Sequence, residues 1–135
     1  MSVVRVNFLP EFHFGDDAVL LTVDGDGLKT FMSALEQAMR TDSSQLLHDG
    51  VEHQFHIEPG TASAELSPGR VVWRLDAAKA AEIADDLAAL SAPRDGGKTA
   101  GHFYVDMTTP ADTLVISRDE YTDITYPWVS PPQTL

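Results

Sequence analysis

The apolar side chains at the start of the chain alternate with polar ones and predict a half-buried strand. Within residues 3–8 the apolar positions on one side are Val4, Val6 and Phe8. This two-residue period is that of a strand with one face on a core. Residues 18–23 form a short apolar run rich in valine and leucine, and we expect a second strand there.

Two segments instead have apolar residues at the three- to four-residue spacing of an amphipathic helix. The first covers residues 27–40, and Asp26 is its expected N-cap because a short carboxylate can accept hydrogen bonds from the first turn. The second begins after Asp76, again an expected N-cap, and runs to about Ser91. Pro93 follows, and proline cannot continue a helix.

Between these helices, two Pro-Gly pairs separate three strand-like segments. Pro59-Gly60 and Pro68-Gly69 suit tight turns, because glycine readily adopts the positive φ that follows proline in a type II turn. The separated segments cover residues 51–58, 61–67 and 70–75. We therefore expect a three-stranded antiparallel meander.

The order of the elements predicts the fold class. A last hairpin, residues 102–107 and 113–117, follows the second helix. The order ββαβββαββ indicates an α+β fold: a mostly antiparallel sheet of about seven strands, with two amphipathic helices on one face. No internal repeat is visible. The length of 135 residues suits one domain. We place that domain at residues 1–121, followed by an extended C-terminal tail rich in proline and aromatics at 122–135.

Charge is the one unusual bulk property. The chain has 9 Lys and Arg against 21 Asp and Glu, a net charge of −12. This charge repels phosphate backbones and anionic lipid heads, so we expect neither nucleic-acid nor membrane-surface binding. It would attract a basic protein partner, although acidity also serves solubility. No apolar run approaches the roughly 20 residues of a membrane span, and no signal-peptide pattern is present. We expect a cytoplasmic protein.

Motifs for cofactors and metals fail on their spacing. There is no cysteine, hence no thiolate zinc site. His53 and His56 would point to opposite faces of their strand. Residues 96–99 look like the end of a phosphate-binding loop, but Ala92 stands where a glycine is needed. We therefore expect no cofactor and no metal.

The best group of polar side chains lies on the expected strand 102–107. His102, Tyr104 and Asp106 share one side of it, because strand side chains alternate, and neighbours are about 7 Å apart. Glu120 follows the hairpin and could approach them. These four are the candidate ligand-binding residues. The alternative interpretation is a solvated sheet face or a dimer surface.

The C-terminal tail supplies two candidate interface residues, Tyr126 and Trp128. Large aromatics are enriched at the centres of protein interfaces. They could equally pack over the protein's own core, and the sequence does not decide between these two.

We predict a small, acidic, bacterial-type protein that acts through protein–protein contacts, as a homodimer or on a basic partner. Its size and charge suit an immunity-like or regulatory binding protein. Two alternatives stay open. One is a small-molecule-binding protein or enzyme with a groove near His102, Tyr104 and Asp106, and the other is a structural subunit of an assembly. The sequence assigns no catalytic residue and leans against an enzyme.

Overall fold

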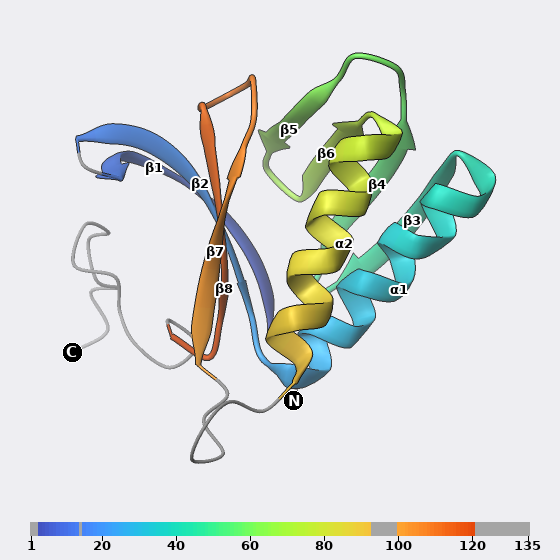
Figure 1. The fold of residues 1–135 in the computed structure, drawn as a ribbon, viewed down its shortest axis with the longest axis horizontal. Helices are drawn as coiled ribbons and strands as arrows, with labels where there is room; N and C mark the ends of the chain where they lie inside the picture. Colours follow the sequence, from blue (N-terminus) through green and yellow to red (C-terminus); the bar gives the residue numbers. More distant parts are fainter. Residues whose placement is uncertain (1–2, 14, 93–99, 121–135) are drawn as a thin grey trace.

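The computed structural model describes residues 3–13, 15–92 and 100–120. Within these ranges, eight strands form two four-stranded sheets (Figure 1). The first sheet has, in spatial order, β1 (Val4–His13), β2 (Asp16–Val23), β8 (Thr113–Arg118) and β7 (Gly101–Asp106). The second has β3 (Ser43–His48), β4 (Val51–Ile57), β6 (Arg70–Leu75) and β5 (Ala62–Ser67). The helices are α1 (Gly25–Thr41) and α2 (Ala77–Ser91).

The α+β class and the order of elements are confirmed, with one strand more than expected. The additional strand is β3, which follows α1 after the single residue Asp42. Its side chains alternate in exposure along the whole strand. The strands also divide between two sheets, and each sheet has a parallel pair at its centre: β2 with β8, and β4 with β6.

The expected meander of residues 51–75 is wrong in its strand order. β6 lies between β4 and β5, parallel to the first and antiparallel to the second. The central place suits β6, because its Trp73 and Leu75 are fully buried. The edge place suits β5, whose side chains are smaller and partly exposed. The two turns occur as predicted, with positive φ at Gly60 and Gly69.

The two halves of the chain share one topology. The first half is β1-β2-α1-β3-β4 and the second is β5-β6-α2-β7-β8. If each strand is replaced by its counterpart in the other half, the order β1-β2-β8-β7 of the first sheet becomes β5-β6-β4-β3. That is the order of the second sheet, taken from its other edge. Each sheet therefore takes one hairpin from each half, and the central parallel pairs join the halves. The sequence shows no such repeat.

The helices lie side by side in front of the second sheet, with the first sheet beside them (Figure 1). Both helices contact strands of both sheets, so the main core lies among these elements. At its centre the Phe31 ring of α1 meets Phe55 and Trp73 edge-on, at centroid distances of 5.2 and 5.4 Å. Such aromatic pairs add about 0.5–1.5 kcal/mol each beyond the burial of their area.

The start of α1 differs from the sequence expectation. Its N-cap is Asp24, whose carboxylate accepts hydrogen bonds from the backbone N–H of Gly27 (2.7 Å) and Val3 (3.0 Å). Asp26 lies inside the first turn instead, where its negative charge interacts favourably with the positive end of the helix dipole. The cap of α2 is Asp76, as predicted.

A second, smaller apolar cluster lies on the other face of the first sheet. Its members are the buried residues Leu9, Ala18, Leu20 and Val115, with Phe12 packed against them. Their strand neighbours Val19, Leu21 and Leu114 belong to the main core, so alternation assigns the cluster to the opposite face.

Neither described helix has the length and apolar composition to span a membrane.

Candidate functional site

The candidate residues of β7 lie on the face of the first sheet that carries the smaller apolar cluster. Tyr104 is the cross-strand neighbour of the cluster residue Val115. His102 lies opposite Ser117, and Asp106 lies opposite Thr113. The register of β7 with β8 therefore decides which polar groups the three candidates can reach.

Three of the four predicted ligand-binding residues form one chain of hydrogen bonds. Tyr104 Oη is 3.2 Å from His102 Nε2, and His102 Nδ1 is 3.1 Å from Glu120 Oε2. Ser117 Oγ donates to the other oxygen of Glu120. With a neutral imidazole protonated at Nδ1, every contact has one donor and one acceptor. The proton of Tyr104 then points at His102 Nε2.

Sequence reasoning missed Ser117, and it included Asp106, which is not in this chain of hydrogen bonds. Ser117 is buried, and it anchors Glu120 three residues further on. The pairing of β7 with β8 could have identified it, because the expected hairpin fixes which residues face each other. Asp106 is exposed at the other end of β7, four residue pairs away from His102 along the strand.

These side chains lie on an open surface. Tyr104 is 52% exposed as a residue, and the His102 and Glu120 side chains are 42% and 27% exposed. Ligand sites usually bury most of a small molecule in a concave pocket. The arrangement therefore suits a reactive or binding surface more than an enclosed active site.

A hollow of about 370 Å³ lies at the junction of the two sheets. Apolar groups supply most of its lining. The lining residues are Phe8 of β1, Ala64, Glu65 and Leu66 of β5, and Thr109 and Pro110 of the β7–β8 connection. Phe8 is 41% exposed there. No sequence pattern pointed to this hollow, because its walls come from three segments far apart in the chain.

An acidic hollow of about 230 Å³ adjoins the apolar one. Pro110 lines both. The acidic hollow also contains Asp16 and Asp17 from the start of β2, and Asp112 before β8. Parallel pairing places Ala18 beside Thr113, and this brings the preceding aspartates together. Asp17 also accepts a hydrogen bond from the backbone N–H of Glu11.

The edge of β5 beside the apolar hollow is partly open. At its start, Ala62 O accepts from Thr108 N (2.8 Å), and Ala64 N donates to Thr109 O (3.1 Å). Backbone groups of every second residue point to the same side of a strand. Leu66 therefore presents its N–H and C=O on this edge, where no described residue forms a backbone hydrogen bond with them.

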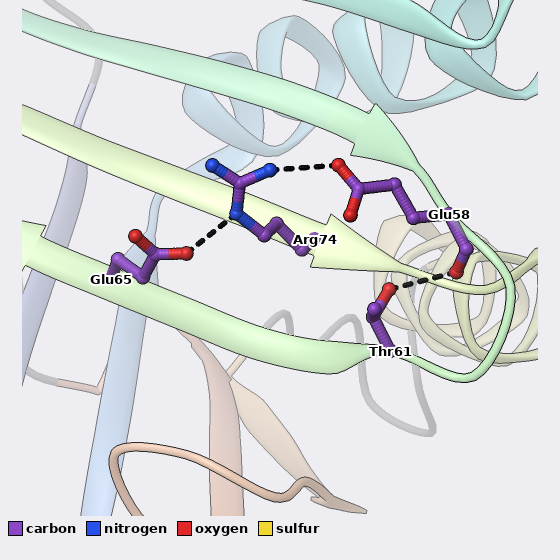
Figure 2. A network of polar contacts seen from close by, with 4 residues as sticks. All are labelled: Glu58, Thr61, Glu65 and Arg74. Atoms are coloured by element: carbon purple, nitrogen blue, oxygen red, sulfur yellow. Dashed lines mark hydrogen bonds and ion pairs between the residues drawn. The ribbon is translucent and has the colours of Figure 1, made fainter.

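An ion-pair network fixes Glu65 at the rim of the apolar hollow (Figure 2). Arg74 Nε is 2.6 Å from Glu65 and its Nη1 is 2.7 Å from Glu58. Thr61 Oγ1 donates to the backbone oxygen of Glu58. The hydrogen bonds to Glu65, and then to Glu58, raise the pKa of Arg74. The charge of Glu65 is thus matched, whereas the three aspartates of the acidic hollow have no ion-pair partner among the described residues.

His53 faces the core and His56 the outer face of the second sheet, as their alternation predicts. His56 lines a small polar hollow there with Ser43 and Gln45. His53 is buried, and its Nε2 has no hydrogen-bond partner among the described residues. Burial, and secondarily the charge of His48, lower the pKa of His53 to about 4. In the described ranges no three His, Asp or Glu residues are placed to hold a metal ion.

The tail residues Tyr126 and Trp128, and residues 96–99, lie outside the described residues. Comparison with protein-family models, with curated proteins and with solved structures found no match to this chain.

Proposed function

We propose that this protein acts by binding a basic protein partner, and that an extended segment of the partner docks where the two sheets meet. The observation that carries this proposal is the apolar hollow that meets the acidic hollow at Pro110, beside the open edge of β5. Each of these three features matches a different part of a basic, extended peptide.

The apolar hollow would take an apolar side chain of the partner. Its volume of about 370 Å³ is at the lower end of the range for small-ligand pockets. Covering the exposed part of Phe8 would contribute about 25 cal/mol for each Å² of apolar surface removed from water.

The open edge of β5 would align the partner backbone. An extended peptide can add a strand to a sheet edge, with main-chain hydrogen bonds for affinity and side-chain pockets for specificity. Leu66 both lines the apolar hollow and presents its backbone groups on that edge. A bound strand would therefore place alternate side chains at the hollow.

The acidic hollow would select a basic segment. Four of the described cations are already paired with carboxylates: Arg70, Arg74, Lys79 and Arg118. In the part of the chain that the structure describes, no cation forms an ion pair with Asp16, Asp17 or Asp112. Complementary charge mainly speeds the encounter and sets specificity, and the net charge of −12 acts in the same direction.

A synthetic peptide in which lysine alternates with valine tests the proposal. We expect it to bind with micromolar affinity at low salt, and the same peptide with glutamate in place of lysine not to bind. A lysine peptide with proline at the central position should bind at least tenfold more weakly, because it lacks a backbone N–H. Fluorescence anisotropy of the labelled peptides measures all three.

Two charge-matched variants locate the site. D16N/D17N/D112N removes three negative charges from the acidic hollow, and E82Q/D85N/D86N removes three from α2. We expect the first to weaken peptide binding at least tenfold and the second to change it far less. Equal losses in both variants, or affinity unchanged between low and high salt, would contradict docking at this groove.

The proposal also includes a homodimer in the cytoplasm. A chain without cysteine forms no disulfide, which is compatible with the cytoplasm and with other compartments. β3 is an outer strand of the second sheet, and its Leu47 is 74% exposed, which offers an apolar contact to a second copy. Sedimentation velocity over a wide concentration range tests the dimer, and a monomer throughout would remove it from the proposal.

A further inference from the structure

We propose that Tyr104 is a nucleophilic tyrosine that accepts an acyl group from neutral activated esters, with His102 as its general base. This reactivity would be separate from partner binding at the groove. It rests on a different set of residues, on the open face of the first sheet.

The geometry has the order hydroxyl, imidazole, carboxylate. Tyr104 Oη lies 3.2 Å from His102 Nε2, and His102 Nδ1 lies 3.1 Å from Glu120 Oε2. A carboxylate on Nδ1 holds the imidazole in the tautomer whose Nε2 can accept a proton. The same order activates hydroxyl nucleophiles in acyl-transfer enzymes, where the imidazole removes the hydroxyl proton during attack.

Glu120 is fixed in place, which makes it a positioning residue. Its second oxygen accepts a hydrogen bond from Ser117, a fully buried residue of β8. Strand pairing places Ser117 directly opposite His102. The carboxylate is therefore held from the same strand pair that holds the imidazole, and the three groups keep their relative positions without an enclosing pocket.

Tyr104 is also accessible. It is 52% exposed, while its ring contacts His102 edge-on at a centroid distance of 5.2 Å. About half of Tyr104 is thus in contact with solvent, on the open face of the sheet that also exposes the His102 side chain. The protein's charge of −12 would repel polyanionic donors such as nucleotides, so a neutral ester is the matched electrophile.

The acyl transfer forms one C–O bond and breaks another. Tyr104 Oη forms a bond to the carbonyl carbon of the ester as its proton moves to His102 Nε2. The bond between that carbon and the leaving alkoxide or phenoxide then breaks, and the leaving group takes the bonding electron pair. The proton passes from His102 to the leaving group or to water. The products are an O-acyl tyrosine and the free alcohol or phenol.

p-Nitrophenyl acetate is the probe, and peptide mapping by mass spectrometry locates the acetyl group. We expect Tyr104 to be acetylated about 100-fold faster than N-acetyltyrosinamide, since general-base assistance supplies roughly 10²–10⁴-fold. H102Q should lower the rate to that of the model compound. H56Q removes a histidine from the outer face of the second sheet and should leave the rate unchanged. Circular dichroism checks that each variant is folded.

The remaining variants distinguish Tyr104 from His102 as the nucleophile and test Glu120 as a positioning residue. Y104F should abolish stable acetylation at this position, and E120A should lower the rate while E120D restores part of it. Acetylation of Tyr104 no faster than the model compound, or equally fast in H102Q, would overturn the proposal. So would nitrophenol release that persists in Y104F, because His102 would then be the nucleophile. Y104F should bind the lysine–valine peptide normally, so the two proposals fail or succeed separately.

Discussion

Trp73 Nε1 lies 3.5 Å from His53 Nδ1 inside the core, and Phe31 packs edge-on against both rings. The indole can donate only if Nδ1 of His53 is unprotonated. Nε2 then carries the ring proton, and it has no hydrogen-bond partner among the described residues. The core thus holds His53 as a neutral imidazole.

This predicts a loss of stability in acid. The pKa of His53 is about 4 in the folded protein, against 6.5 for an ordinary histidine. Between these pH values the unfolded chain takes up a proton that the folded protein does not. The free energy of unfolding should therefore fall as the pH falls from 6.5 to 4, by about 3 kcal/mol in total from this residue.

Urea denaturation of the wild type and of H53F across this pH range measures the effect. The variant should lose less stability than the wild type, because the carboxylates act equally in both and only the histidine differs. Parallel pH dependences in the two proteins would show that His53 is not held neutral.

The cap of α1 gives a second prediction: replacing Asp24 should cost more stability than replacing Asp26. D24A removes the acceptor of two backbone N–H groups and should lower the free energy of unfolding by about 1–2 kcal/mol. D26A removes only a charge in the first turn and should cost a few tenths of a kcal/mol. Equal losses in chemical denaturation would argue against Asp24 as the cap.

Gly27 gives a third prediction, in which replacement by alanine changes stability in the opposite direction to the usual one. Alanine usually stabilises a helix relative to glycine, by about 0.5–1 kcal/mol. A Cβ at Gly27 would lie 1.8 Å from the backbone oxygen of Val3, so the first strand would have to move. G27A should therefore destabilise the protein, by about 1–3 kcal/mol as for other overpacked sites. A higher melting temperature for G27A would contradict the close approach.

The fourth prediction concerns Phe8 in the proposed groove. F8S should weaken binding of the lysine–valine peptide at least tenfold, because it removes the largest apolar side chain of the hollow. The folded state should lose little, since Phe8 is already 41% exposed. M39S changes a similarly exposed apolar residue on α1, 38% exposed, and is the matched control. Similar binding losses in both variants would place the peptide elsewhere.

The sequence by itself determined the local features of this protein. Alternation put His102, Tyr104 and Asp106 on one face of a strand. Helical spacing located both helices, and the Pro-Gly pairs located two turns. Asp76 was recognisable as a cap because a cap bonds only to the next few residues. All of these depend on side-chain period or on hydrogen bonds within one turn, so a short stretch of chain carries the whole pattern.

Only the tertiary structure decided which strands are neighbours. Hydrogen bonds between strands form through backbone groups that nearly every residue possesses. The sequence of a strand therefore does not specify which other strand it pairs with. Packing of the inner faces on the helices placed β6 between β4 and β5 and divided the strands into two sheets. The same long-range pairing set Ser117 opposite His102 and brought Phe8 and Leu66 to one hollow. The chemistry of both candidate sites follows from these contacts between distant segments.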